Sequence, residues 1–192
     1  MKSLGSIMII ALTASFFQAC NGNTKNSSTA KADSIGILRD TASKQVVNVE
    51  RGDAQFAMAA ASGGLTEVEL GKIAEQRATN RLVKNFGAMM VKDHSKANDK
   101  LQALAKAKNI NLPDAPNAGD QQTIDKLIKL SGRDFDKAYI SDMIDDHKND
   151  IKEFKYASKN CNDPDIKHFA AKILPILQNH LDAINEVRAN MK

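Results

Sequence analysis

The chain of 192 residues contains no tryptophan, only two tyrosines and only two cysteines. It therefore lacks the aromatic platform on which nucleic-acid bases stack. Its formal charge of +4, which becomes +3 once Lys2 is removed with the N-terminal segment, comes from basic residues interleaved with acids. We expect no nucleic-acid partner.

No apolar run of transmembrane length is seen near the N-terminus. The run Ser6–Phe17 (SIMIIALTASFF) has the length of a signal peptide, since a spanning helix needs about 20 residues. It ends at Ala19-Cys20, which is typical of a bacterial lipoprotein signal. We expect cleavage before Cys20, removal of residues 1–19, and a lipid on Cys20. Ordinary secretion with cleavage near Ala19 is the alternative.

Lipidation of Cys20 would leave Cys161 as the single free thiol, so no intramolecular disulfide is available. Removal of 19 of the 192 residues leaves 173, which is enough for one domain with a sizeable core. We expect Cys161 to be an inert thiol in a turn. The fold must then be stabilised by its core alone.

The segment from residue 20 to about residue 50 is rich in Asn, Ser, Thr, Lys and Asp and shows no apolar period. Such a composition predicts a flexible tether. We expect residues 51–192 to form the domain that this tether holds at the cell envelope, anchored to the outer membrane and facing the periplasm. The membrane is the one partner that the sequence indicates, through the lipid.

From Gly52 onward, apolar residues recur at spacings of three and four, and clusters of β-branched residues are absent. This pattern predicts an all-α domain. We expect long helices over residues 53–78, from 80 to about 104, over 133–159 and from 163 to about 187, and a short helix over 120–130.

Local signals set several helix ends. Asn80 is a good N-cap, and Asp163-Pro164 is an N-cap followed by proline at the first helical position. Gly63-Gly64 predicts a break in the first helix, with Thr66 opening its second half. The connector at 109–119 (NINLPDAPNAG) is rich in Pro, Gly and Asn.

Two helical pairs with tight turns, joined by a crossover of about twenty residues, are the plan of a ferritin-like four-helix bundle. The short helix over 120–130 lies in that crossover, between the second and third long helices. It is expected to pack alongside the bundle or to cap it.

Three of the four histidines lie midway along different helices, on the apolar stripe. Buried imidazoles must be hydrogen-bonded, paired or bound to a metal. A fourth helix offers Glu67 in a comparable place. The sequence therefore predicts a candidate metal site formed by Glu67, His94, His147 and His180.

The usual di-iron pattern of ferritin-like proteins, two Glu-x-x-His pairs plus two further glutamates, is missing. The residues three positions before His94, His147 and His180 are Val91, Ile144 and Leu177. This absence argues against a carboxylate-bridged oxidase. The remaining donor set suits a transition metal ion such as Fe, Mn, Zn or Cu.

Four residues near the histidines in the sequence are weaker candidates for a role in the metal site. Asp93 and Asp146 precede His94 and His147, and adjacent helical residues point about 100° apart. Each is either a solvated acid or a partner that orients an imidazole on another helix. Met90 and Met143 precede the same histidines by four residues, so they are either soft ligands for Cu(I) or ordinary core residues.

Four stretches of the domain resemble a known family. They are DAQFAMAAASGGLTEVELGKIA, FGAMMVKDHSKAN, FDKAYISDMIDDHKNDI and LPILQNHLDAI. Together they are similar to the bacterial family called domain of unknown function 4142, over about residues 51–190. The resemblance implies a ferritin-like helical fold in a secreted or envelope protein, and it implies no particular reaction.

Three functions stay open at this point. The first is a lipid-anchored metal-binding or metal-responsive bundle. The second is a non-catalytic protein that binds an envelope partner, in which the buried histidines and acids fix the helix register. The third is an oxidoreductase with a divergent metal centre. No motif of the chain indicates a particular catalytic residue, and we favour the first, non-enzymatic interpretation.

Overall fold

A computed structural model describes residues 49–191, and these form five helices and no strand. The helices are α1 (Arg51–Arg77), α2 (Arg81–Ala107), α3 (Ala118–Leu127), α4 (Gly132–Asn160) and α5 (Pro164–Ala189). The predicted all-α class is confirmed. The predicted signal peptide (1–19) and Cys20 lie outside the described residues, as does nearly all of the tether.

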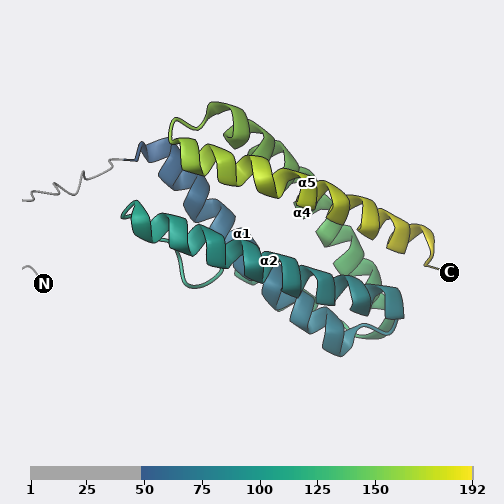
Figure 1. Cartoon of the computed structure of the whole chain (residues 1–192). Helices are drawn as coiled ribbons and strands as arrows, with labels where there is room; N and C mark the ends of the chain where they lie inside the picture. Colours follow the sequence, from purple (N-terminus) through teal and green to yellow (C-terminus); the bar gives the residue numbers. More distant parts are fainter. Residues whose placement is uncertain (1–48, 192) are drawn as a thin grey trace, which may run out of the picture. The chain divides into compact units, whose positions relative to one another are not determined.

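The four long helices form two hairpins. Tight turns at residues 78–80 and 161–163 join α1 to α2 and α4 to α5, and each pair packs along its length (Figure 1). The second hairpin meets the first through looser contacts, α2 against α5 and α1 against α4. Four mid-helix regions therefore face one another across a shared interior.

The predicted helix starts are seen where a side chain caps the backbone. The Asn80 side chain accepts a hydrogen bond from the Leu82 N–H. The Asp163 side chain accepts from the N–H groups of Asp165 and Ile166, and Pro164 takes the first helical position. These contacts satisfy N–H groups that a helix leaves free at its start, so α2 and α5 begin where their sequences indicate.

The predicted break at Gly63-Gly64 is wrong, because α1 continues through both glycines. Thr66 does not cap a second helix. Its hydroxyl donates back to the Ser62 carbonyl at 2.9 Å. Gly64 instead gives room to α2, since a Cβ atom there would overlap the Asn98 side chain.

A second close approach fixes how α1 and α2 pack. A Cβ atom on Gly71 would lie 2.7 Å from the Gly87 carbonyl oxygen, and one on Gly87 would lie 2.7 Å from the Gly71 oxygen. Only glycine allows two backbones this near each other. The contact also places Glu67, one turn before Gly71, against the middle of α2.

The crossover between α2 and α4 contains α3, as predicted, although α3 begins at Ala118 rather than at residue 120 and ends at Leu127. The Asn117 N–H donates to the Ser62 hydroxyl at 2.9 Å, and that hydroxyl donates to Asp120 at 2.8 Å. The start of α3 is thereby attached to the middle of α1. Gly132, with a φ of 60°, then makes the turn into α4.

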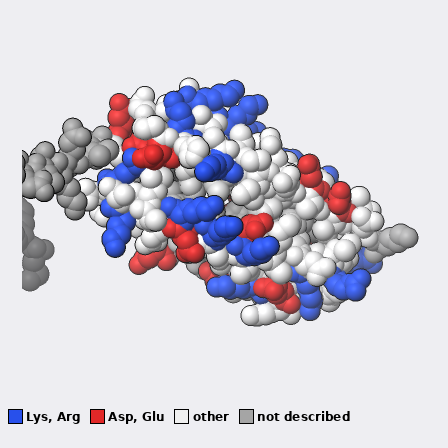
Figure 2. Space-filling model, in the orientation of Figure 1, with Lys and Arg blue, Asp and Glu red and all other residues white. Residues whose placement is uncertain are grey.

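The surface of the domain is charged and mixed. On the face that carries α2 and α5, basic side chains run along the centre with acidic ones between them (Figure 2). Lys92, Lys96 and Lys100 are all exposed on α2, as a solvated helix face predicts. None of the described helices is both long enough and apolar enough to cross a membrane.

Candidate metal centre

The structure brings Glu67, His94, His147 and His180 together in the interior, and we call these four residues the His–Glu cluster. Their side chains come from α1, α2, α4 and α5, and their exposed fractions are 1%, 5%, 0% and 1%. Glu67 is mid-helix and does not face a helix N-terminus, because α1 is unbroken.

The cluster is a polar layer between two apolar cores. One core includes Leu70, Phe86, Tyr139 and Ile184, and the other includes Ala57, Leu101, Phe154, Ile166 and Leu177. On every long helix, the cluster residue falls between the positions that contribute to one core and those that contribute to the other. The helical phase that buries both cores therefore also turns these four side chains inward.

The three imidazoles lie at one level of the interior. Their ring centroids are 5.2 Å (His94 and His180), 5.3 Å (His147 and His180) and 5.9 Å (His94 and His147) apart. One nitrogen of each ring lies within 4.8 Å of the corresponding nitrogens of the other two.

Hydrogen bonds on the outer side of two rings decide which nitrogens carry protons. His147 Nδ1 lies 3.0 Å from the Met143 carbonyl oxygen, and His180 Nε2 lies 3.1 Å from Asp93 Oδ2. A carbonyl and a carboxylate accept hydrogen bonds, so both outer nitrogens are the N–H donors. In neutral rings, the inner nitrogens then carry lone pairs.

These inner nitrogens, His147 Nε2 and His180 Nδ1, are 3.2 Å apart. Two lone pairs cannot hydrogen-bond to each other, whereas a cation between them is attracted to both. With metal–nitrogen distances of about 2.0–2.1 Å, a nitrogen separation of this size corresponds to an angle of about 100° at the metal. The pair is arranged as two ligands of one ion would be.

Glu67 reaches toward two of the rings. Its Oε2 lies 2.7 Å from His94 Nδ1, and its Oε1 lies 3.4 Å from His147 Nδ1. Despite these short distances, neither oxygen has a hydrogen-bond partner with proper direction among the described residues, and neither has His94 Nε2. Such buried atoms are costly unless something else pairs with them.

One further buried atom of the described chain has no partner, the Tyr139 hydroxyl. It lies in the apolar core that contains Phe86 and Phe135. Nothing in the structure explains it.

Burial keeps the three imidazoles of the cluster uncharged at neutral pH. It lowers the pKa of His94 to about 4 against the opposing charges of Asp146 and Asp93, and it lowers the pKa of His147 to about 3. It lowers the pKa of His180 as well, although the bond to Asp93 opposes the shift. Burial also raises the pKa of Glu67 well above its ordinary value. Neutral imidazoles are the form that binds metals.

The two aspartates beside the histidines lie in different places. Asp93 is partly buried and accepts from His180, so it orients an imidazole on a neighbouring helix. Asp146 lies on the other side, where its carboxylate, Glu67 and His147 offer ligand atoms within 4.8 Å of one another. Burial and the nearby Glu67 raise the pKa of Asp146 to about 8.

The two methionines and the cysteine considered in the sequence analysis are buried among core residues. Met90 and Met143 are fully buried in the apolar core of Leu70 and Phe86, with the Met143 carbonyl serving His147. Cys161 is buried, and burial raises the pKa of its thiol to about 11, as expected of an inert thiol.

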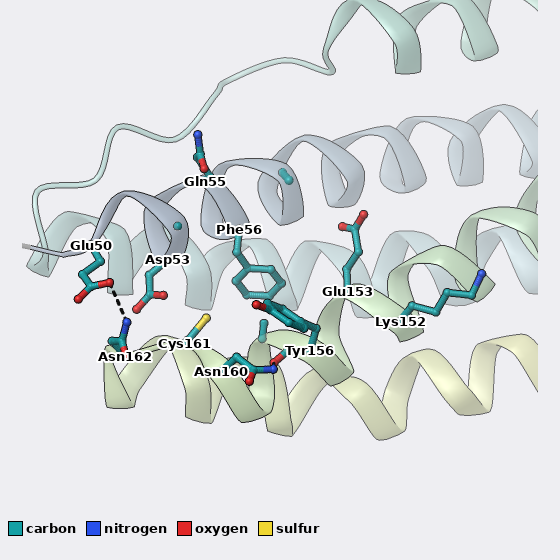
Figure 3. Close-up of a pocket in the computed structure, with 13 residues that line it drawn as sticks. Glu50, Asp53, Gln55, Phe56, Lys152, Glu153, Tyr156, Asn160, Cys161 and Asn162 are labelled. Atoms are coloured by element: carbon teal, nitrogen blue, oxygen red, sulfur yellow. Dashed lines mark hydrogen bonds between the residues drawn. The ribbon is translucent and has the colours of Figure 1, made fainter.

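A groove of about 550 Å³ lies elsewhere, between the start of α1 and the end of α4. Figure 3 shows Phe56 and Tyr156 in this groove, with Cys161 at one end. Two of its carboxylates have partners, since Glu50 accepts from Asn162 and Asp53 accepts from the Asp163 N–H, both at 2.7 Å. Among the described residues, the groups of side chains close enough together to hold a metal ion lie in and beside the His–Glu cluster, not in this groove.

Sequence reasoning missed the acidic surroundings of the cluster. Asp142 and Asp150 flank Asp146 by one helical turn each on α4, and all three are partly buried. Burial raises the pKa of Asp142 to about 6 and that of Asp150 well above its ordinary value. The spacing of four residues was the available signal, because such residues share a helix face.

The fold and the cluster define a class, an all-α protein with a buried group of histidine and carboxylate side chains. Within that class, the chain belongs to the family described as domain of unknown function DUF4142, whose model matches residues 38–187.

Solved structures with the same fold come from other proteins. A DUF305 fragment from Deinococcus radiodurans is 10% identical and has a TM-score of 0.66, with 75% of this chain and 99% of that one covered. CopM in its Cu(II)-bound form is 14% identical and has a TM-score of 0.62, with 73% of this chain and 97% of that one covered. CopM in an Ag-bound form is 15% identical with a TM-score of 0.60, and the shares covered are 72% and 96%. No curated protein matches the sequence.

Proposed function

We propose that this protein is a lipid-anchored envelope protein that binds a transition metal ion in the His–Glu cluster. Its domain is a ferritin-like four-helix bundle in which each long helix contributes one ligand. Glu67, His94, His147 and His180 hold the ion, and Asp93 orients His180. The anchor is the lipid on Cys20, at the outer membrane facing the periplasm.

The facing lone pairs of His147 and His180 carry this proposal. Both rings have their outer nitrogens engaged, so a proton on either inner nitrogen would charge a ring that is buried. A metal ion satisfies both nitrogens, and it also gives partners to the Glu67 oxygens. A purely architectural network would be expected to pair its own atoms.

The donor set favours a borderline metal. Imidazole suits Zn, Cu, Fe and Ni, and the general affinity order of divalent ions reaches its maximum at Cu²⁺. CopM, a protein of the same fold, has been solved with Cu(II) and with Ag. We therefore expect Cu²⁺ to bind more tightly than Zn²⁺ and Mn²⁺ at this cluster.

The test measures metal content and stability of the full chain. After dialysis against Cu²⁺ or Zn²⁺, elemental analysis is expected to find a bound ion that His180→Gln loses. Metal at 100 times its Kd should raise the free energy of unfolding of the wild type by about 2.7 kcal/mol.

The matched control is His168→Gln, because His168 is an exposed histidine on the same helix as His180. It is expected to keep the ion and the stabilisation. Equal metal uptake by His180→Gln and the wild type would reject the His–Glu cluster as the site. A Cys20→Ser variant that still carries lipid by mass spectrometry would reject the anchor.

A further inference from the structure

Three aspartates of α4 form a row that the metal centre above does not use. Asp142, Asp146 and Asp150 are four residues apart and partly buried, whereas the side chain of Asp145 between them is 73% exposed. In the described part of the chain, no lysine or arginine lies within 4.0 Å of the carboxylates in this row, although Asp145 has such a contact with Lys148.

A row of acids alone does not make a site, but this one faces an unpaired buried carboxylate. Glu67 is 1% exposed, and both its oxygens lack hydrogen-bond partners in residues 49–191. One oxygen lies against His94 of α2, and the other lies on the α4 side, 3.4 Å from His147. Glu67, Asp146 and His147 offer ligand atoms within 4.8 Å of one another.

The His147 nitrogen on this side is not free to bind an ion, because Nδ1 donates to the Met143 carbonyl. What remains between α1 and α4 is a pair of carboxylates, with two more acids one turn away on either side. Carboxylate oxygens suit hard cations such as Mg²⁺, Ca²⁺ and Mn²⁺ rather than soft ones.

We propose that Glu67 and Asp146 form a second cation position, between α1 and α4, of the oxygen-ligand type that accepts Mn²⁺. Asp142 and Asp150 supply negative charge around it. This second position shares Glu67 with the proposed transition-metal centre. The role given to Glu67 as a ligand therefore rests on the proposed function. The second position does not use His94 or His180, so the two positions can be tested apart.

The experiment titrates the full chain with Mn²⁺ and follows free Mn²⁺ by electron paramagnetic resonance. The wild type is expected to bind one equivalent that Asp146→Asn weakens at least tenfold. Asp150→Asn, which removes a neighbouring charge, is expected to weaken it about threefold. Circular dichroism checks that each variant is folded.

Two controls separate this proposal from its alternatives. Asp145→Asn removes an exposed acid from the same helix and should leave Mn²⁺ binding unchanged, as should His180→Gln. Wild-type affinity in Asp146→Asn overturns the second position. So does loss of Mn²⁺ in His180→Gln, since that ion would then lie among the imidazoles. Failure of the proposed function appears separately, as Cu²⁺ uptake that His180→Gln does not change.

Discussion

Two buried polar clusters of the described domain differ in whether their atoms have partners. The Lys–Asp cluster consists of Lys108, Asp163 and Asp53, at the end of α2 and the starts of α5 and α1. Lys108 Nζ lies 2.6 Å from Asp163 and 2.9 Å from Asp165, and the Asp163 N–H donates to Asp53 at 2.7 Å. Asp163 Oδ1 also caps α5.

The His–Glu cluster is also buried but lies at mid-helix, and three of its polar side-chain atoms have no partner among the described residues. Native proteins pair nearly all buried polar groups. The Lys–Asp cluster obeys this rule because it joins helix ends and serves the fold. The His–Glu cluster departs from it, and a bound ion at the proposed metal centre would give its unpaired atoms partners.

The largest expected difference between the clusters is in the effect of removing one member. Lys108→Met leaves the Asp163 carboxylate buried without its cation, and we expect it to lower the free energy of unfolding by about 2 kcal/mol. Urea denaturation measures this change. Metal binding should be unaffected, because the Lys–Asp cluster contributes no ligand to the proposed metal centre.

Lys106→Met is the matched control for that variant, since Lys106 is exposed on the same helix. It should change stability by less than about 0.5 kcal/mol. Equal effects of the two substitutions would show that the ion pair contributes no stability. The Lys–Asp cluster would then have no stabilising role in the fold.

The parts that the sequence predicted are those with a local or periodic cause. Asn80 and Asp163 cap helices through bonds to residues two or three positions away, so their role is written in a short stretch of sequence. The inward direction of His94 and His147 follows from the same period of 3.6 that places Met90 and Met143 in the core.

The parts that it did not predict depend on a neighbouring helix. Gly63-Gly64 reads as a break from propensity alone, but packing against α2 uses the missing side chain at Gly64. The aspartate row of α4 looks like a solvated face until α1 and α3 are placed beside it. Only the tertiary packing determines which face of a charged helix is covered by its neighbours.

The pH dependence of stability tests whether the imidazoles of the His–Glu cluster are uncharged in the folded protein. The pKa of His94 is lowered from 6.5 to about 4 in the fold, so between these values the unfolded chain binds a proton that the folded chain does not. Stability therefore falls as the pH drops through this window, by up to about 1.4 kcal/mol per pH unit from this residue. His94→Gln, studied with chelator present, should flatten the slope by that amount.

His168→Gln tests whether any histidine has this effect. His168 is exposed, and its removal should leave the dependence of unfolding free energy on pH unchanged between pH 4 and 6.5. If the unfolding free energy of His94→Gln depends on pH as steeply as that of the wild type, the buried ring is already protonated in the folded protein. A protonated ring could not bind a metal ion.

The smallest expected effect on the free energy of unfolding is that of Glu67→Met, and its sign is opposite to that of Lys108→Met. This difference in sign distinguishes the two clusters most clearly. Glu67→Met replaces a buried, unpaired carboxyl with an apolar side chain of similar size, which removes a desolvation cost. We expect the metal-free protein to gain about 1 kcal/mol in unfolding free energy, measured by urea denaturation in chelator, and to lose metal affinity. Glu69→Met, at an exposed position of the same helix, should do neither. If Glu67→Met is less stable than the wild type in chelator, Glu67 stabilises the fold, as Lys108 does. A carboxyl group whose role is to bind a metal ion is not expected to stabilise the metal-free protein.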